Sequence, residues 1–252
     1  IGYMADLDAA TLEEFIDYKN TYYSPNNAVL VVAGDIDIDK TKKMIQDYFG
    51  PIPTGNKVER NYPKETPITE EVRTKTFDNN IQIPAAVVAY RTPGFATREA
   101  HVFDMISSYL SDGKSSKLYK KMVDDQKQAL QVGAFNVGQE DYGMYLVFGL
   151  PIGEVSLETL VSEMEEEIAA VRETLISESD YQKLQNKFEN QFVNSNSSVE
   201  GIAGSLATYH MLYGDTSLIN KEIEVYRSIT REEIKKVAAA FLNPSQRVVI
   251  DY

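Results

Sequence analysis

The chain has 252 residues, of which 43% are hydrophobic and 25% are charged, and it carries a formal net charge of −13 at pH 7. This composition is typical of a globular protein, and the length suffices for one large domain or for one domain with part of another. The negative charge argues against nucleic-acid binding, because that binding depends on lysine and arginine side chains that neutralise phosphates. The absence of cysteine excludes disulfides, zinc sites built from thiolates and cysteine nucleophiles. No apolar run reaches the roughly 20 residues that a transmembrane helix needs.

The first fifty residues predict two helices on either side of a strand. Thr11 and Glu14 have the spacing of a capping box, and Pro25 stops the helix that they begin. A run rich in valine and leucine comes next and is typical of a buried strand. The predicted elements are a helix at 11–23, a strand at 27–35, and a helix at 38–49 capped by Asp37 or Asp39.

The remaining residues predict neighbouring strands and grouped helices. Strands joined by short turns, with helices gathered elsewhere, indicate an α+β fold with an antiparallel or mixed sheet. Pro84 lies inside one predicted strand and indicates an edge strand or a bulge. The predicted elements are a strand at 81–91, helices at 97–111 and 115–125, strands at 128–137 and 142–150, helices at 156–175, 177–194, 198–213, 219–227 and 230–242, and a strand at 246–252.

The segment that closes the chain repeats a segment near its beginning. Residues 11–31 and 230–250 align without a gap at a constant offset, 230 − 11 = 219. Both contain threonine and glutamate at capping-box spacing, then a proline, then a run rich in valine. We therefore predict a duplicated unit, and we expect the chain to begin inside its first copy. The predicted domains are the closing part of the first unit at 1–57, a linker at 58–68 and a second, non-catalytic unit at 69–252.

Side chains that could catalyse a reaction or bind a metal form no recognisable constellation in the sequence. His101 and His210 each lie on a predicted helix without a second histidine four residues away, so a structural role is expected for both. The acidic run 163–167 is interpreted as a solvated helix face, and Ser111–Ser116 as a turn between helices with a serine cap. The residues alone therefore predict no catalytic site and no metal site.

Two sequence motifs resemble a known enzyme family. The segment TYYSPNNAVLVVAGDIDIDKTKKMIQDYFGPIP at 21–53 is similar to the stretch that closes the first domain of the M16 (pitrilysin/insulinase-like) zinc peptidases. The segment SDGKSSKLY at 111–119 resembles the glycine-rich turn and Ser-Arg-Leu helix of that family, with Lys117 in place of the usual arginine. The resemblance covers essentially the whole chain, as the C-terminal portion of one subunit or half. It implies an α+β unit of the LuxS/MPP-like metallohydrolase type, present in two copies.

The resemblance implies a zinc-dependent endopeptidase whose paired units enclose an unfolded peptide in a clamshell. In this family a helix with the motif H-x-x-E-H supplies two histidine ligands and a glutamate that activates the zinc-bound water, and a further glutamate completes the site. Such a zinc ion lowers the pKa of its water and polarises the scissile carbonyl. None of these residues can be carried over to this chain, so zinc is implied for the whole protein and no cofactor is expected in this chain.

A second functional pair of the family is also missing from this sequence. Many members carry an arginine and a tyrosine seven residues apart, which bind substrate and stabilise the oxyanion. An ungapped alignment places these positions at Val123 and Leu130, whose side chains cannot donate a hydrogen bond. In members with divided labour one half carries zinc and the other carries this pair, so a chain without the pair is expected to come from the zinc-bearing half.

The expected function is the non-catalytic C-terminal region of an M16-type endopeptidase, which forms part of the clamshell wall and supports the zinc-bearing domain. The alternative is a segment of a degenerate, inactive M16-like structural or processing-complex subunit. Whether the whole protein is an enzyme stays open, and the chain alone is expected to be inactive. The expected partners are an unfolded peptide and a second M16-type half, in trans or in the same chain. The compartment also stays open, with the bacterial periplasm or cell envelope slightly favoured.

Overall fold

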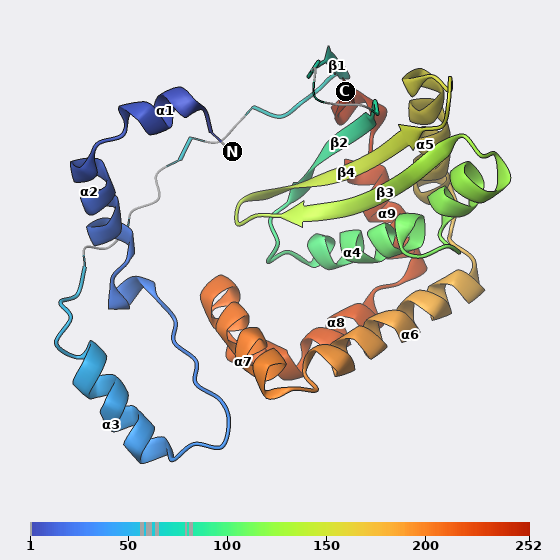
Figure 1. Ribbon diagram of the computed structural model, residues 1–252. Coiled ribbons are helices and arrows are strands. Elements are labelled where there is room, and N and C mark those ends of the chain that lie inside the picture. Colours follow the sequence, from blue (N-terminus) through green and yellow to red (C-terminus); the bar gives the residue numbers. More distant parts are fainter. Residues whose placement is uncertain (1, 56–57, 59–61, 64–65, 79, 81–82) are drawn as a thin grey trace. The chain divides into compact units, whose positions relative to one another are not determined.

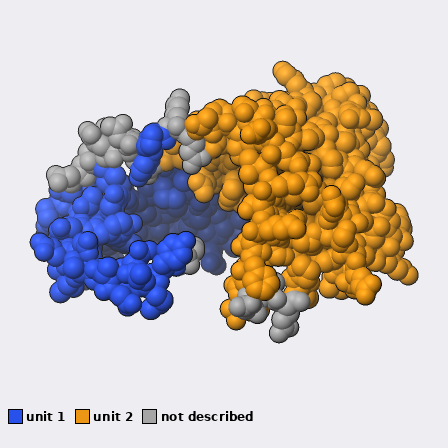
Figure 2. Space-filling model, turned by 90° about the horizontal axis from the view of Figure 1, so that it is seen from above, with its two compact units in different colours: residues 1–65, 195–219 blue, residues 66–194, 220–252 orange. Residues whose placement is uncertain are grey.

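The computed structural model describes residues 2–55, 58, 62–63, 66–78, 80 and 83–252. The chain divides into two compact units, which Figure 2 colours separately. The first unit takes residues 1–65 and 195–219, and the second takes residues 66–194 and 220–252. The division after residue 65 falls inside the linker expected at 58–68, whereas 195–219 comes from within the range expected for the second domain. The domain limits proposed from the sequence therefore stay a prediction.

The first unit contains short helices and irregular segments. Both helices predicted for the first fifty residues are confirmed. In the first, the Thr11 hydroxyl accepts the Glu14 backbone N–H at 3.3 Å, and the Glu14 carboxylate accepts the Thr11 N–H at 2.7 Å. In the second, the Asp37 carboxylate is the cap. The elements are α1 (Met4–Ala9), α2 (Leu12–Tyr22), η1 (Pro25–Asn27), α3 (Ile38–Phe49), α7 (Val199–Thr208) and η3 (Tyr209–Tyr213), followed by η4 (Thr216–Asn220).

The strand predicted at 27–35 is wrong for this structure. After η1 the chain runs to residue 36 without a helix or a strand. A strand is stable only when its N–H and C=O groups are paired, and the described part of the chain offers this segment no partner strand. Its apolar side chains are consequently exposed, with Leu30 at 56% and Val32 at 44% of their free surface.

The second unit is built on a mixed five-stranded sheet. The strand order is β1-β5-β2-β4-β3, in which β1 pairs with β5 in parallel and every other pair is antiparallel. Pro84 precedes β2, which is an interior strand, so the edge strand or bulge expected there is wrong. Because Pro84 lies before the strand, its missing N–H removes no hydrogen bond between strands. Of the strand predicted at 81–91, residues 81–82 lie outside the described residues. The strands are β1 (Val72–Lys75), β2 (Ala86–Pro93), β3 (Ala129–Gly138), β4 (Tyr142–Pro151) and β5 (Arg247–Asp251).

Helices cover one face of this sheet, and the core lies between them and the strands (Figure 1). Along β2 every second residue is buried, and Tyr90 and its β4 neighbour Tyr145 are almost fully enclosed. Among the described helices, none combines the length and the apolar composition that crossing a bilayer requires. The helical elements are α4 (Arg98–Ser111), the π-helical η2 (Tyr119–Asp125), α5 (Leu157–Glu173), α6 (Glu178–Ser195), α8 (Glu222–Ser228), α9 (Arg231–Phe241) and η5 (Pro244–Gln246).

The sequence repeat is also a repeat of local structure. Adding 219 to the limits of α2 (12 and 22) gives those of α9 (231 and 241), and adding it to those of η1 (25 and 27) gives those of η5 (244 and 246). The two caps have nearly the same backbone, with φ −98° and ψ 156° at Thr11 and φ −98° and ψ 164° at Thr230. The copies diverge only afterwards, because β5 is paired and residues 28–32 are not.

A cluster of ion pairs joins the sheet to α5. Arg247, only 7% exposed, donates to Glu71 from Nε at 2.8 Å and to Glu165 from Nη1 at 2.5 Å. Arg172 donates to the other oxygen of Glu165 at 2.6 Å. Burial and the charge of Glu165 raise the pKa of Tyr90, which donates to the same carboxylate, to about 12.

The acidic run 163–167 is therefore not the solvated helix face predicted from the sequence. Besides Glu165, three of its carboxylates surround the ammonium group of Lys121, with Glu163 at 2.8 Å, Glu166 at 2.6 Å and Glu167 at 3.6 Å. The prediction was wrong because the partners of these carboxylates come from distant parts of the sequence.

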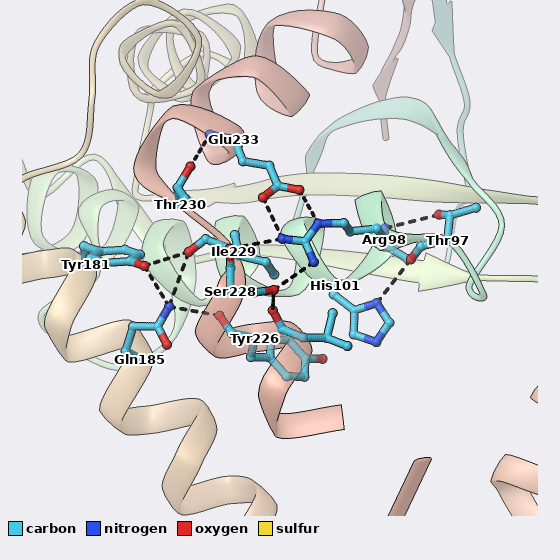
Figure 3. Close-up of polar contacts among 12 residues, drawn as sticks. Thr97, Arg98, His101, Tyr181, Gln185, Tyr226, Ser228, Ile229, Thr230 and Glu233 are labelled. Atoms are coloured by element: carbon cyan, nitrogen blue, oxygen red, sulfur yellow. Dashed lines mark hydrogen bonds and ion pairs between the residues drawn. The ribbon is translucent and has the colours of Figure 1, made fainter. Parts of the chain in front are cut away.

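A second polar contact joins the beginnings of α4 and α9 (Figure 3). The Arg98 guanidinium donates to both oxygens of Glu233, from Nε at 2.5 Å and from Nη2 at 2.8 Å. It also donates to the Ser228 hydroxyl at 2.9 Å. The Glu233 N–H donates to the Thr230 hydroxyl, which caps α9, at 3.2 Å. Glu233 itself, in the first turn of the helix, anchors α9 to α4.

Replacing Arg247 by methionine is expected to lower the free energy of unfolding by about 2 kcal/mol, because Glu71 and Glu165 lose their shared cation and each keeps only its other arginine, Arg73 or Arg172. Urea denaturation followed by circular dichroism measures the loss. The matched control is Lys120→Met, which removes an exposed pair with Asp125 and should cost less than about 0.5 kcal/mol. Equal losses in the two variants would contradict the role of Arg247.

Glu233→Gln is expected to remove a pH-dependent part of the stability. The Arg98 guanidinium holds the pKa of Glu233 below its ordinary value, so the stabilisation is complete above pH about 4.3 and is lost as the pH falls through the lowered value. The difference from the unsubstituted chain should be about 1 kcal/mol at pH 7, after screening at a partly exposed site, and should shrink steadily as the pH falls through and below the lowered pKa. Urea denaturation at several pH values tests this, with Glu232→Gln on the same turn as control. A difference that stays the same at every pH would show that the charge is not responsible.

Candidate functional site

Two positions, Val123 and Leu130, align with the arginine–tyrosine pair of the family. Val123 lies just before the edge strand β3, and Leu130 lies at its start. Val123 is in η2, partly buried against the core. Leu130 lies at an irregularity in the pairing of β3 with β4 and is 53% exposed. Neither side chain carries a hydrogen-bond donor. The expectation that this chain lacks the pair's role stays a prediction.

The other residues singled out in the sequence have local structural contacts. The ring of His101, on α4, packs edge-on against Tyr226 with centroids 5.2 Å apart. His210 is exposed in η3. The Ser116 hydroxyl donates to the Gly113 carbonyl at 2.7 Å, within the turn that follows α4.

A zinc ion needs three or four ligands drawn from histidine, cysteine, aspartate or glutamate. Within the ranges that the structure describes, no three such side chains gather into a group that could hold a metal ion. His101 and His210 also belong to different units. The described residues thus do not fit the zinc ion that the resemblance implies for the whole protein.

The face of the sheet opposite the helices is apolar and partly open. Because side chains alternate along a strand, the residues between the buried positions of β2, β3, β4 and β5 share this face. Phe135 and Met144 are 42% and 45% exposed. The Phe148 ring lies over Gly133, where an added Cβ would be 2.3 Å from a ring carbon, and 6.3 Å from the Phe135 ring. The face consists of Val87, Ala89, Phe135, Val137, Met144, Leu146, Phe148, Leu150, Val248 and Ile250, with Arg91 among them.

The strand β3 is one edge of the sheet, and its outer side has backbone groups that β4 does not use. The Gln139 N–H donates to the Tyr142 carbonyl at 3.1 Å, which sets the alternation of paired and outward-facing residues. Consistent with this alternation, the Ala134 carbonyl accepts a hydrogen bond at 2.8 Å from Ser111 on α4. The residues whose backbone groups face outward are Val132, Ala134 and Asn136. This edge is able to pair with a further strand.

An open pocket of about 520 Å³ lies beside this edge. Its helical wall is a polar stripe along α4, in which the spacing i, i+3, i+4, i+7 places all four side chains on one face. The Ser108 hydroxyl is buried there and has no hydrogen-bond partner in the part of the chain that the structure describes. The lining residues are Asp104, Ser107, Ser108 and Ser111 from α4, Asp112, residues 133–136 from β3, and Phe188 and Gln191 from α6.

Aromatic and acidic groups position Asp104 in the pocket wall. Tyr226, from α8, donates from its hydroxyl to Asp104 at 2.8 Å. Its ring is stacked on Phe188, with centroids 4.5 Å apart and planes at 17°. Nε2 of His101, on α4, lies 3.8 Å from Glu222, which is on α8 like Tyr226. Burial raises the pKa of Asp104, whereas the hydrogen bond from Tyr226 acts in the opposite direction. The site therefore offers a carboxylate, hydroxyls and an aromatic ring beside an unpaired strand edge.

This pocket was not predicted, although part of its signal is visible in the sequence. Polar residues at 104, 107, 108 and 111 share the period of a helix whose other face is apolar. Such a stripe is usually a solvated face. Only the packing of α6 and β3 against it makes a pocket.

Comparisons with known proteins agree with this architecture. Residues 9–188 match the family described as Peptidase M16 inactive domain. The zinc protease PqqE of Helicobacter pylori is 22% identical over 253 residues, which cover 99% of this chain and 56% of that protein. A solved protease from Helicobacter pylori superposes with a TM-score of 0.92 at 20% identity, over 99% of this chain and 61% of that one. The first half of the periplasmic protease PqqL from Escherichia coli superposes with a TM-score of 0.76 at 13% identity, over 99% of this chain and 56% of that one.

At these identities the structural likeness shows the fold, and it confirms the α+β unit with a mixed sheet packed against helices. The chain spans about half the length of the curated relatives that it matches, 56% and 53% of the first two. The match to the family's inactive domain extends over more than half of the chain. We conclude that this chain belongs to the M16 peptidase family, in which it corresponds to the inactive C-terminal domain.

Proposed function

We propose that this chain is the non-catalytic C-terminal region of a zinc-dependent M16 endopeptidase, where it supports the preceding zinc-bearing domain and walls in an unfolded peptide. The observation that carries the proposal is the repeat at an offset of 219, since its first copy exposes the side chains that its second copy buries. Zinc and the residues that activate water would belong to the preceding domain.

The burial of equivalent residues differs sharply between the copies. Ile234 on α9 is 1% exposed, whereas its equivalent on α2, Phe15 (234 − 219), is 61% exposed. Val249 in β5 is 1% exposed, whereas its equivalent, Leu30 (249 − 219), is 56% exposed. An α-helix and a strand of this kind are stable when a sheet and further helices cover them. We infer that the preceding domain supplies that cover and receives residues 28–32 as a strand.

The second unit supplies two surfaces suited to an unfolded peptide. The open apolar face of the sheet offers contact to hydrophobic side chains, which an unfolded substrate exposes. The edge of β3 offers backbone hydrogen bonds, which any extended segment can make whatever its sequence. These two surfaces support the proposal that the second unit forms part of the wall around the enclosed peptide.

The alternative is a segment of an inactive M16-like structural or processing-complex subunit. It shares this fold and makes the opposite prediction for the preceding domain, in which H-x-x-E-H would be missing. A second M16-type half, in the same chain or in trans, is part of both proposals, and a bacterial periplasm or cell envelope remains the favoured compartment.

Phe15→Ser is expected to destabilise the longer protein by about 3 kcal/mol, because there the ring would fill a core. In the 252-residue chain, where the ring is exposed, the same change should cost less than about 0.5 kcal/mol. Thermal or urea unfolding of both forms gives the comparison, with the exposed Tyr48→Ser as control in each. Equally small effects in both forms would count against a supporting role for the first copy.

An extended peptide added to the chain is expected to slow amide hydrogen exchange at Val132, Ala134 and Asn136 by about tenfold or more, because those N–H groups would pair with it. Exchange followed by NMR resolves the residues. The other edge strand, β1, is the internal control and should not change. Protection confined to β1, or absent from both edges, would rule out peptide pairing on β3.

A further inference from the structure

We propose that the pocket beside β3 receives one cationic side chain, of lysine or arginine, from a peptide strand paired with β3. The inference rests on the proposed function, because it requires a peptide at that edge. Side chains of a paired strand alternate between the two faces of the sheet. Every second side chain of the peptide would therefore lie on the side of α4, where the pocket is.

Among the side chains that the structure describes, no cationic one binds the carboxylate of Asp104 in this pocket. Its hydrogen bond comes from the neutral hydroxyl of Tyr226, and in the described part of the chain it forms no ion pair. The other acid of the pocket, Asp112, is already bound by Lys187. A carboxylate removed from water is stabilised by a nearby opposite charge. The charge of His101 acts on Asp104 from a distance, but its Nε2 lies 3.8 Å from Glu222.

The remaining walls also suit a cation. Phe188, which stacks on Tyr226, gives the pocket an aromatic ring, and aromatic rings attract ammonium and guanidinium groups. Among the described residues the buried hydroxyl of Ser108 has no hydrogen-bond partner, and its oxygen is able to accept a hydrogen bond from either group. At about 520 Å³ the pocket is large enough for the side chain of lysine or arginine.

Other side chains fit the pocket less well. A peptide glutamate or aspartate would meet the charge of Asp104 and would be repelled. A purely apolar side chain would displace water from Asp104 and Ser108 without replacing its hydrogen bonds. The charge and the hydrogen-bonding groups of the pocket thus select a donor with a positive charge.

The test compares the binding of four extended peptides that differ at one position, which holds lysine, arginine, norleucine or glutamate. Binding to the 252-residue chain is measured by calorimetry at low salt. The lysine and arginine peptides are expected to bind about tenfold more tightly than the norleucine peptide. In Asp104→Asn this preference should fall below about twofold. Asp125→Asn, which removes the same charge outside the pocket, should keep the preference.

The outcomes separate this inference from the proposed function. If the norleucine peptide binds but lysine gives no advantage, or if Asp104→Asn keeps the preference, the pocket is not a cation site and the peptide wall stands. If no peptide binds the chain, both proposals are overturned. Should circular dichroism show that Asp104→Asn is unfolded, Phe188→Leu replaces it, with an expected loss of preference of about threefold. An unchanged preference in that variant would overturn the inference.

Discussion

The buried guanidinium of Arg247 holds together the parts of the second unit that the sequence keeps far apart. It begins β5, which lies between β1 and β2, and it binds Glu71 next to β1 and Glu165 on α5. A charge this deeply buried is tolerated only when carboxylates surround it, so placing β5 also places β1 and α5. The antiparallel pairing of β2, β4 and β3 then leaves β3 as the free edge beside the pocket.

The two copies of the repeat show how far local sequence carries a structure. Thr11 and Thr230 begin helices of the same length, and Pro25 and Pro244 begin the same short turn of helix. The second copy then continues with Arg247, whereas the first has Ala28 at the equivalent position, 247 − 219 = 28. Without partner strands, the first copy keeps its helix and exposes its apolar face.

The function that we propose for the second unit depends on the partly open face and the outer edge of its sheet. Helices cover one face, the other face is apolar and partly open, and the outer edge of β3 has backbone groups that face away from β4, of which the Ala134 carbonyl accepts a hydrogen bond from Ser111. Beside that edge lie Asp104, which accepts a hydrogen bond from Tyr226, and the Ser108 hydroxyl, which has no partner among the described residues. We propose that such a surface holds an extended peptide, while the family region that the chain matches is described as inactive.

The sequence by itself predicted most of the helices, though not α1, because helix caps, prolines and helical periods act within a few residues. It also predicted the hairpin of β3 and β4, an antiparallel or mixed sheet and the resemblance to the M16 family. Only the tertiary structure decided that 27–35 is unpaired, that Pro84 precedes an interior strand and that the acidic run binds Lys121. The same holds for the pocket at Asp104. Strand pairing, ion pairs and pockets depend on residues far apart in the chain, and a single sequence does not reveal which of them meet.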